Sequence, residues 1–150
     1  MLVSLNRWFS QHLQTAETAA AHNVELATAV LLYEIMRADN KFEPQEQAVY
    51  LQQLEEHFTL TAEELAELCE LTSKQAEEAV DFQQFTSVIN DSCDINQKRL
   101  ILDSLWLIAF SDHDLSGEEE YTIRKIADLL YLPHSQFIKS KLAVLSSIKK

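Results

Sequence analysis

The chain has 150 residues, with 24 Asp or Glu against 12 Lys or Arg, so its formal net charge is −12. The length fits one domain with a real core. Such an acidic surface argues against nucleic-acid binding and favours a cation or a basic protein surface as partner. With one Gly and two Pro, the chain has few of the residues that sheet turns need, so we predict an all-α fold.

Cysteine use and the absence of long apolar runs bear on the compartment. The chain's two cysteines form no CxxC pair, which fits a reducing cytoplasm. The N-terminal residues lack the apolar region and cleavage site of a signal peptide. No apolar run approaches the roughly 20 residues that span a bilayer. We therefore expect a cytoplasmic protein.

The first predicted element is an amphipathic helix over residues 2–20, because Leu2, Leu5, Phe9 and Leu13 recur at helical spacing. We assign residues 1–22 to this N-terminal helix and residues 23–150 to a helical domain. The apolar stripe of the N-terminal helix is expected to pack on the helical domain. The alternatives are that this helix docks to a partner protein or lies on a membrane surface. The scarcity of Lys and Arg in the helix argues against the membrane.

Two predicted helices, residues 24–38 and 95–110, are apolar almost all round and are expected at the centre of the domain. Between them, Pro44 begins a helix that runs to about His57. The other elements before residue 95 are a short helix through Leu71 with a Thr61–Glu64 capping box, another begun by Ser73, and a helix over 81–92.

Two further helices are predicted after residue 110. A Ser116–Glu119 capping box begins one that reaches about Tyr131. Pro133 begins the last, with Phe137, Leu142 and Leu145 as apolar anchors. The whole chain is thus predicted to form a single-domain bundle of seven or eight helices.

The chain also repeats itself. Asp39, Phe42 and Glu46 align with Asp112, Leu115 and Glu119. One residue is then skipped, and the apolar positions of the next two helices align as well, namely Leu51, Leu54, Phe58, Leu60 and Leu65 with Ile123, Ile126, Leu130, Leu132 and Phe137. One such unit could not cover its own apolar helix, so we predict two pseudo-repeated halves packed together.

An acidic turn follows each apolar helix. In the second turn, Asp112, Asp114 and Ser116 resemble the opening of an EF-hand loop, but the twelfth position is Ile123 instead of Glu, which excludes a standard EF-hand. A shorter loop could gather Asp112, Asp114 and a carboxylate from Glu118 or Glu119 around Ca²⁺ or Mg²⁺, weakly bound. The first turn is poorer, because Lys41 replaces the second Asp and leaves Asp39, Glu43 and Glu46. The competing interpretation is structural: acidic residues suit the positive end of a helix dipole.

Other polar residues point less clearly to chemistry. Glu34 and Asp103 lie inside the apolar helices and are expected to face solvent or find hydrogen-bond partners. The rival function is a carboxylate-based metalloenzyme. Di-iron bundles carry Glu-x-x-His on their helices, and no histidine here has Glu three residues before it. The sequence therefore ranks an enzyme low.

The segments "MRADNKFEPQE" and "FSDHDLSGEEE" resemble the paired motifs of the TerB family of tellurite-resistance proteins. The resemblance covers about residues 24–146. Asp39 and Glu46 match the first motif, and Asp112 and Glu119 the second. The chain departs from the family at three positions, since Asn40 and His113 stand where Gly is usual and Ser111 replaces Ala. The resemblance implies an all-helical fold, an acidic face, metal binding and no established catalytic activity. We therefore expect a non-enzymatic stress-response module that acts through contacts with an unidentified protein.

Overall fold

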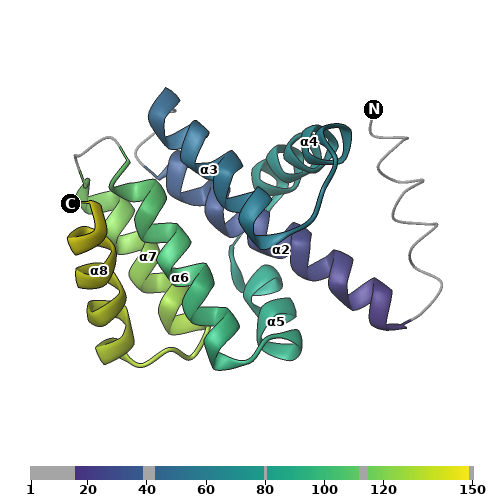
Figure 1. The fold of residues 1–150 in the computed structure, drawn as a ribbon. Coiled ribbons are helices and arrows are strands. Elements are labelled where there is room, and N and C mark those ends of the chain that lie inside the picture. Colours follow the sequence, from purple (N-terminus) through teal and green to yellow (C-terminus); the bar gives the residue numbers. More distant parts are fainter. Residues whose placement is uncertain (1–15, 39–42, 80, 112–114, 149–150) are drawn as a thin grey trace.

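The computed structural model describes residues 16–38, 43–79, 81–111 and 115–148, with side chains from residue 24 onward (Figure 1). Over these ranges the fold is all-α and contains no strand, as predicted. The seven helices described are α2 (Ala16–Arg37), α3 (Pro44–His57), α4 (Ala62–Glu78), α5 (Gln83–Ser92), α6 (Ile95–Ala109), α7 (Gly117–Leu129) and α8 (His134–Ile148).

The two apolar helices lie at the centre, as their composition predicts. Helix α2 contacts α3, α4, α5, α6 and α7, while α6 contacts α2, α3, α7 and α8. Most side chains from Ala27 to Met36 of α2 and from Ile101 to Ala109 of α6 are therefore buried, including Leu31, Leu32, Leu105 and Trp106, each with 0% exposure. The first turns of α6 are less covered, since Ile95 and Leu100 are exposed. Burial of this apolar surface is the main favourable term in folding.

The two halves pack reciprocally. Helix α3 of the first half packs on α6, and α7 of the second half packs on α2. The buried positions of α3 and α7 also match at a constant separation in the sequence. The buried residues Glu46, Tyr50 and Leu54 of α3 correspond to the buried residues Glu119, Ile123 and Ala127 of α7. Each half thus covers the central helix of the other, which supports the predicted pseudo-repeat.

The one-residue offset between the halves lies after the α3/α7 pair, not inside it as the sequence alignment placed it. The buried residues keep one separation through both helices, so the extra residue of the first half falls between α3 and the buried part of α4. Beyond it, the buried residues Leu68 and Thr72 of α4 correspond to the buried residues Ser140 and Val144 of α8. The two halves therefore correspond in this corrected register, with Glu46 equivalent to Glu119 and Leu68 equivalent to Ser140.

Three sequence predictions of helix position need correction. Helix α2 begins at Ala16 and is continuous, so the break expected between helices over 2–20 and 24–38 is absent; residues 1–15 lie outside the described ranges. Helix α4 is also continuous, and Ser73 lies within it with its hydroxyl 3.3 Å from the Tyr33 hydroxyl. Leu142 is 58% exposed, because α8 buries the face carrying Phe137, Ser140 and Val144 instead.

The C-terminus of α7 is capped by side chains from the α5–α6 region. Asn90 Nδ2 donates to the Leu129 carbonyl at 3.0 Å, and Lys98 Nζ donates to the Leu130 carbonyl at 3.1 Å. A cation there is stabilised by the negative end of the helix dipole. The chain then leaves the helix through Tyr131, whose φ of 60° is the one positive φ among the described non-glycine residues.

Candidate functional site

The start of α7 is the best-defined part of the predicted cation site. The Ser116 hydroxyl accepts from the Glu119 backbone N–H at 3.0 Å, and Glu119 Oε1 accepts from the Ser116 N–H at 3.0 Å, which confirms the predicted capping box. Glu119 has 0% exposure, and its second oxygen, Oε2, is buried with no hydrogen-bond partner in the described part of the chain. Such an oxygen is costly unless it is satisfied.

The start of α3 repeats this arrangement with different capping. Glu43 is the N-cap residue and makes no side-chain capping bond, while Pro44 takes the first helical position. Glu46 stands at the third position, as Glu119 does in α7, and is 1% exposed. Two glutamates at equivalent positions of the pseudo-repeat are therefore turned into the protein.

The remaining predicted ligands divide into two groups. Glu118 is exposed at the second position of α7. Asp39, Asp112 and Asp114 lie outside the described residues. The helix ends that flank the two acidic turns lie on the same side of the molecule (Figure 1), and Val49 of α3 and Ser111 after α6 line one cavity there. Among the residues that were described, no group of three or more His, Cys, Asp or Glu side chains is placed to hold a metal.

A polar network at the α3–α6 interface was not predicted from the sequence. The Ser104 hydroxyl donates to Gln53 Oε1 at 2.7 Å and lies 2.7 Å from His57 Nε2, which donates to it when that nitrogen carries the proton. Gln53 Nε2 in turn donates to Glu56 Oε2 at 3.3 Å. Gln53 and Ser104 are buried, at 6% and 2% exposure. The buried Ser104 hydroxyl is thus a structural link between two helices and not an exposed nucleophile.

Burial also sets the protonation of this network. It lowers the pKa of His57, and the neighbouring Glu56 carboxylate opposes part of that shift. In the reciprocal α7–α2 interface the corresponding residues are apolar and each 0% exposed. The counterparts of Ser104, Gln53 and His57 are Leu31, Ile126 and Leu130, respectively. The polar network is therefore a difference between the two halves, and no periodicity in the sequence marks it.

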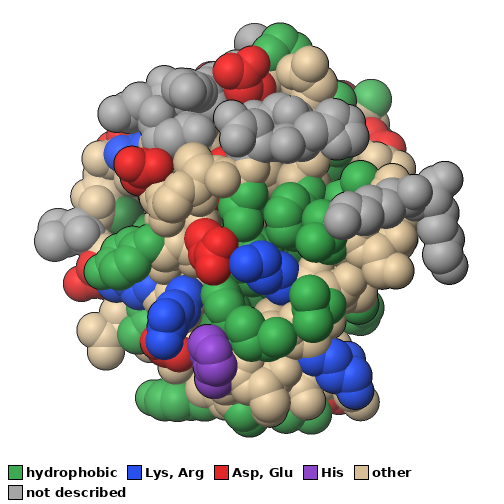
Figure 2. Space-filling view, turned by 90° about the vertical axis from the view of Figure 1, so that its left-hand side faces the viewer, with side chains coloured by type: hydrophobic (Ala, Val, Ile, Leu, Met, Phe, Trp, Pro, Cys, Tyr) green, Lys and Arg blue, Asp and Glu red, His purple; other side chains and the backbone are tan. Residues whose placement is uncertain are grey.

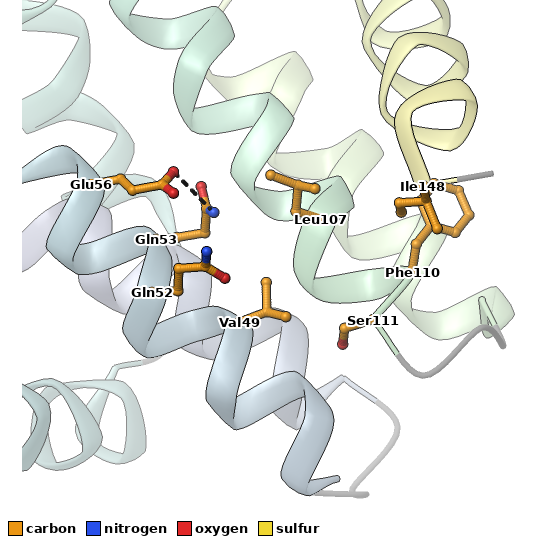
Figure 3. Close-up of a pocket in the computed structure, with 8 residues that line it drawn as sticks. All are labelled: Val49, Gln52, Gln53, Glu56, Leu107, Phe110, Ser111 and Ile148. Carbon is orange, nitrogen blue, oxygen red and sulfur yellow. Dashed lines mark hydrogen bonds between the residues drawn. The ribbon is translucent and has the colours of Figure 1, made fainter. Parts of the chain in front are cut away.

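A cavity of about 310 Å³ lies beside the network (Figure 3). Its walls come from α3, the C-terminal end of α6 and the end of α8, and Figure 3 shows apolar side chains opposite the Gln53–Glu56 pair. The lining residues are Val49, Gln52, Gln53, Glu56, Leu107, Phe110, Ser111 and Ile148. Its volume is at the lower end of the range for ligand pockets.

The two acidic residues inside the central helices find partners, as predicted. Glu34 pairs with Arg37 at 3.4 Å, and burial raises the pKa of its carboxyl while Arg37 opposes the shift. Asp103 accepts a hydrogen bond from Ser140 of α8. Both cysteines are free thiols whose pKa is raised by burial, which disfavours the reactive thiolate.

The comparison with protein families gives a match that agrees with this fold. The family described as "Tellurite resistance protein TerB" matches residues 25–142, which span α2 to α8 and include both acidic turns. No curated protein and no solved structure gives a significant match. Within the described ranges, every helix is too short or too polar to cross a membrane. The family match covers most of the sequence and both halves of the pseudo-repeat, so the chain belongs to the TerB family of tellurite-resistance proteins.

Proposed function

We propose that this TerB domain is a non-enzymatic, acidic module of a stress response. It acts in the cytoplasm through contacts with another protein and binds a divalent cation, Ca²⁺ or Mg²⁺, weakly. Family membership supports a tellurite-resistance-type module. The net charge of −12 supports attraction of cations and of basic protein surfaces.

The buried carboxylate of Glu119 carries the cation part of this proposal. Its Oε1 is held by the Ser116 N–H, while Oε2 has no partner within the ranges described. Asp112, Asp114 and Glu118 closely precede Glu119 in the sequence and supply the further oxygens that hard cations prefer. Crowded carboxylates repel one another, and a divalent cation at this turn relieves that repulsion.

The melting temperature in the presence of millimolar Ca²⁺ or Mg²⁺ tests this site, because a ligand that binds only the folded state stabilises it. Asp112→Asn with Asp114→Asn is expected to abolish the metal-dependent rise while leaving the helical circular dichroism spectrum unchanged. Glu77→Gln with Glu78→Gln is the matched control, since it removes the same charge from two exposed residues at the end of α4. A wild-type rise no larger than that of the aspartate double variant rejects the cation site.

The exposed face of α8 supports the protein-contact part. Figure 2, viewed from the left of Figure 1 where α8 lies, shows hydrophobic side chains interspersed with acidic and basic ones. Ile138 and Leu142 of α8 are 38% and 58% exposed and one helical turn apart. Aromatic and aliphatic groups set in a polar rim are typical of protein interfaces.

Affinity capture from the native host tests this face. Ile138→Ser with Leu142→Ser is expected to lose a partner that the wild-type chain retains at stoichiometric level. Ile95→Ser with Leu100→Ser, which changes two exposed aliphatic residues of α6, is the matched control. Equal retention by the α8 variant means that the contact lies on another face.

The alternative function, a carboxylate-based metalloenzyme, makes a different prediction about the purified protein. Stoichiometric iron or manganese in metal analysis favours the enzyme. Weak, exchangeable Ca²⁺ or Mg²⁺ favours the proposed module.

A further inference from the structure

The cavity between α2, α3 and α4 differs from the corresponding region of the second half. It has a volume of about 300 Å³ and is lined by Tyr33, Met36, Gln47, Tyr50, Leu51 and Cys69. We call it the Tyr33–Cys69 cavity. It is a different space from the cavity beside the α3–α6 network, with which it shares no lining residue.

In the second half, side chains of the protein pack together at the corresponding positions. Trp106 corresponds to Tyr33, Lys141 to Cys69, and Glu120 to Gln47. Trp106 is fully buried, and Lys141 Nζ lies 5.6 Å from the centre of its ring. The same ammonium group pairs with Glu120 at 3.2 Å. The first half replaces the long lysine with a short cysteine at this place and has a cavity there.

The chemistry of the cavity walls favours an uncharged occupant. Gln47 and Cys69 replace both members of the Glu120–Lys141 ion pair, so a charged ligand meets no opposite charge among the lining residues. Burial raises the pKa of Tyr50 and of Cys69, so the phenol and the thiol stay neutral.

The same walls favour an aromatic ring with one polar group. Tyr33 and Tyr50 meet edge to face, with ring centres 6.2 Å apart, and the Met36 thioether provides a soft surface beside them. The Tyr50 side chain is 4% exposed. Its hydroxyl lies near Thr72 and Cys69 but makes no hydrogen bond of normal geometry with any described residue. A buried hydroxyl in this state is a ready partner for a polar atom of a ligand.

From these observations we propose that the Tyr33–Cys69 cavity binds a small neutral aromatic molecule of one or two rings that carries a hydrogen-bonding group. The size is suitable, because an apolar cavity of about 150 Å³ is known to hold benzene, and this one is larger. The inference does not depend on the cation site or on the α8 contact face proposed above.

Protection of the two free thiols tests the proposal in the wild-type chain, with indole as the probe. Cys69 lines the cavity, whereas Cys93 lines another cavity and serves as the internal control. Alkylation of each thiol by iodoacetamide is followed by mass spectrometry. At indole ten times its dissociation constant, mass action predicts that alkylation of Cys69 slows about tenfold, with Cys93 unchanged. Equal protection of both thiols, or of neither, overturns the proposal.

A second measurement uses a variant that copies the second half. Gln47→Glu with Cys69→Lys restores the ion pair and the long side chain, and we expect it to lose the saturation-transfer NMR signal from protein to indole that wild type gives. Cys93→Lys is the matched control and is expected to keep the signal. Retention of the signal by the double variant, with its helical content intact, contradicts the assignment. The wild-type protection experiment decides the question alone if the variant does not fold.

Discussion

The Ser104 hydroxyl joins α3 to α6, and its removal should destabilise the protein measurably. Ser104→Ala deprives the buried Gln53 Oε1 of a donor 2.7 Å away and His57 Nε2 of its partner at the same distance. Leaving a buried polar group unsatisfied costs about 1–3 kcal/mol. Alanine returns about 0.5 kcal/mol through its higher helix propensity. Taking the middle of that range and subtracting the gain from alanine, we expect a net loss of about 1.5 kcal/mol in the free energy of unfolding.

The second half of the protein supplies the matched control for this loss. There, Leu31, Ile126 and Leu130 occupy the places of Ser104, Gln53 and His57. The triple variant Ser104→Leu, Gln53→Ile and His57→Leu copies that apolar interface. Replacing all partners of a buried polar network by packed apolar groups is close to neutral or stabilising. We therefore expect the triple variant to be at least as stable as wild type, although the single alanine variant is not.

Urea denaturation followed by circular dichroism measures both effects. The alanine variant should unfold at lower urea with an unchanged slope, as expected when stability alone changes. Its melting temperature should fall by about 3–6 °C, from about 2–4 °C per kcal/mol for a chain of this size. If Ser104→Ala lies within about 0.5 kcal/mol of wild type, the normal range for a surface change, the network adds nothing. If the triple variant is weaker than the single one, the correspondence between the two interfaces is wrong.

Three further predictions concern single side chains. Burial lowers the pKa of His57, so below pH 6.5, the ordinary pKa of histidine, the unfolded chain binds more protons than the folded chain. The stability that neutral His57 contributes should be complete above that pH and fall as the pH drops through it. His57→Leu should flatten this fall in urea titrations at several pH values. Tyr131→Gly should raise the free energy of unfolding by about 1 kcal/mol, because Gly accepts the φ of 60° without a Cβ clash. Tyr131→Ala keeps the Cβ, so an equal gain from that variant in the same titration would contradict this reason. Ser116→Ala should lower the free energy of unfolding by about 1 kcal/mol through the lost cap of α7, with or without added metal. Thr61→Ala should lower it by about 1 kcal/mol through the lost cap of α4. An unchanged thermal midpoint in both variants would rule out the capping contribution.

Local signals predicted the helices well where the residues that decide them are close in sequence. The Ser116–Glu119 and Thr61–Glu64 capping boxes each involve a pair three residues apart, and both are formed. The pattern failed at Ser73, which resembles a helix cap but instead directs its hydroxyl to Tyr33 of α2. A partner 40 residues away leaves no local signal.

The candidate site was predictable only in part, for the same reason. The inward position of Glu119 follows from the capping box, whereas the Ser104 network needs α3 and α6 to meet, with partners 47 and 51 residues apart. The Tyr33–Cys69 cavity arises from differences in side-chain length between two halves that share one backbone plan. Such differences become visible only when both halves are seen folded. The cation site itself stays a prediction.

Reciprocal packing of the halves bears on how the chain folds as it is synthesised. Helix α2 is synthesised before α6 and α7, yet these two later helices cover part of its apolar surface. Until then the nascent chain displays an apolar stripe that only its own second half can bury. Incomplete chains of this kind are prone to aggregate and are typical clients of chaperones.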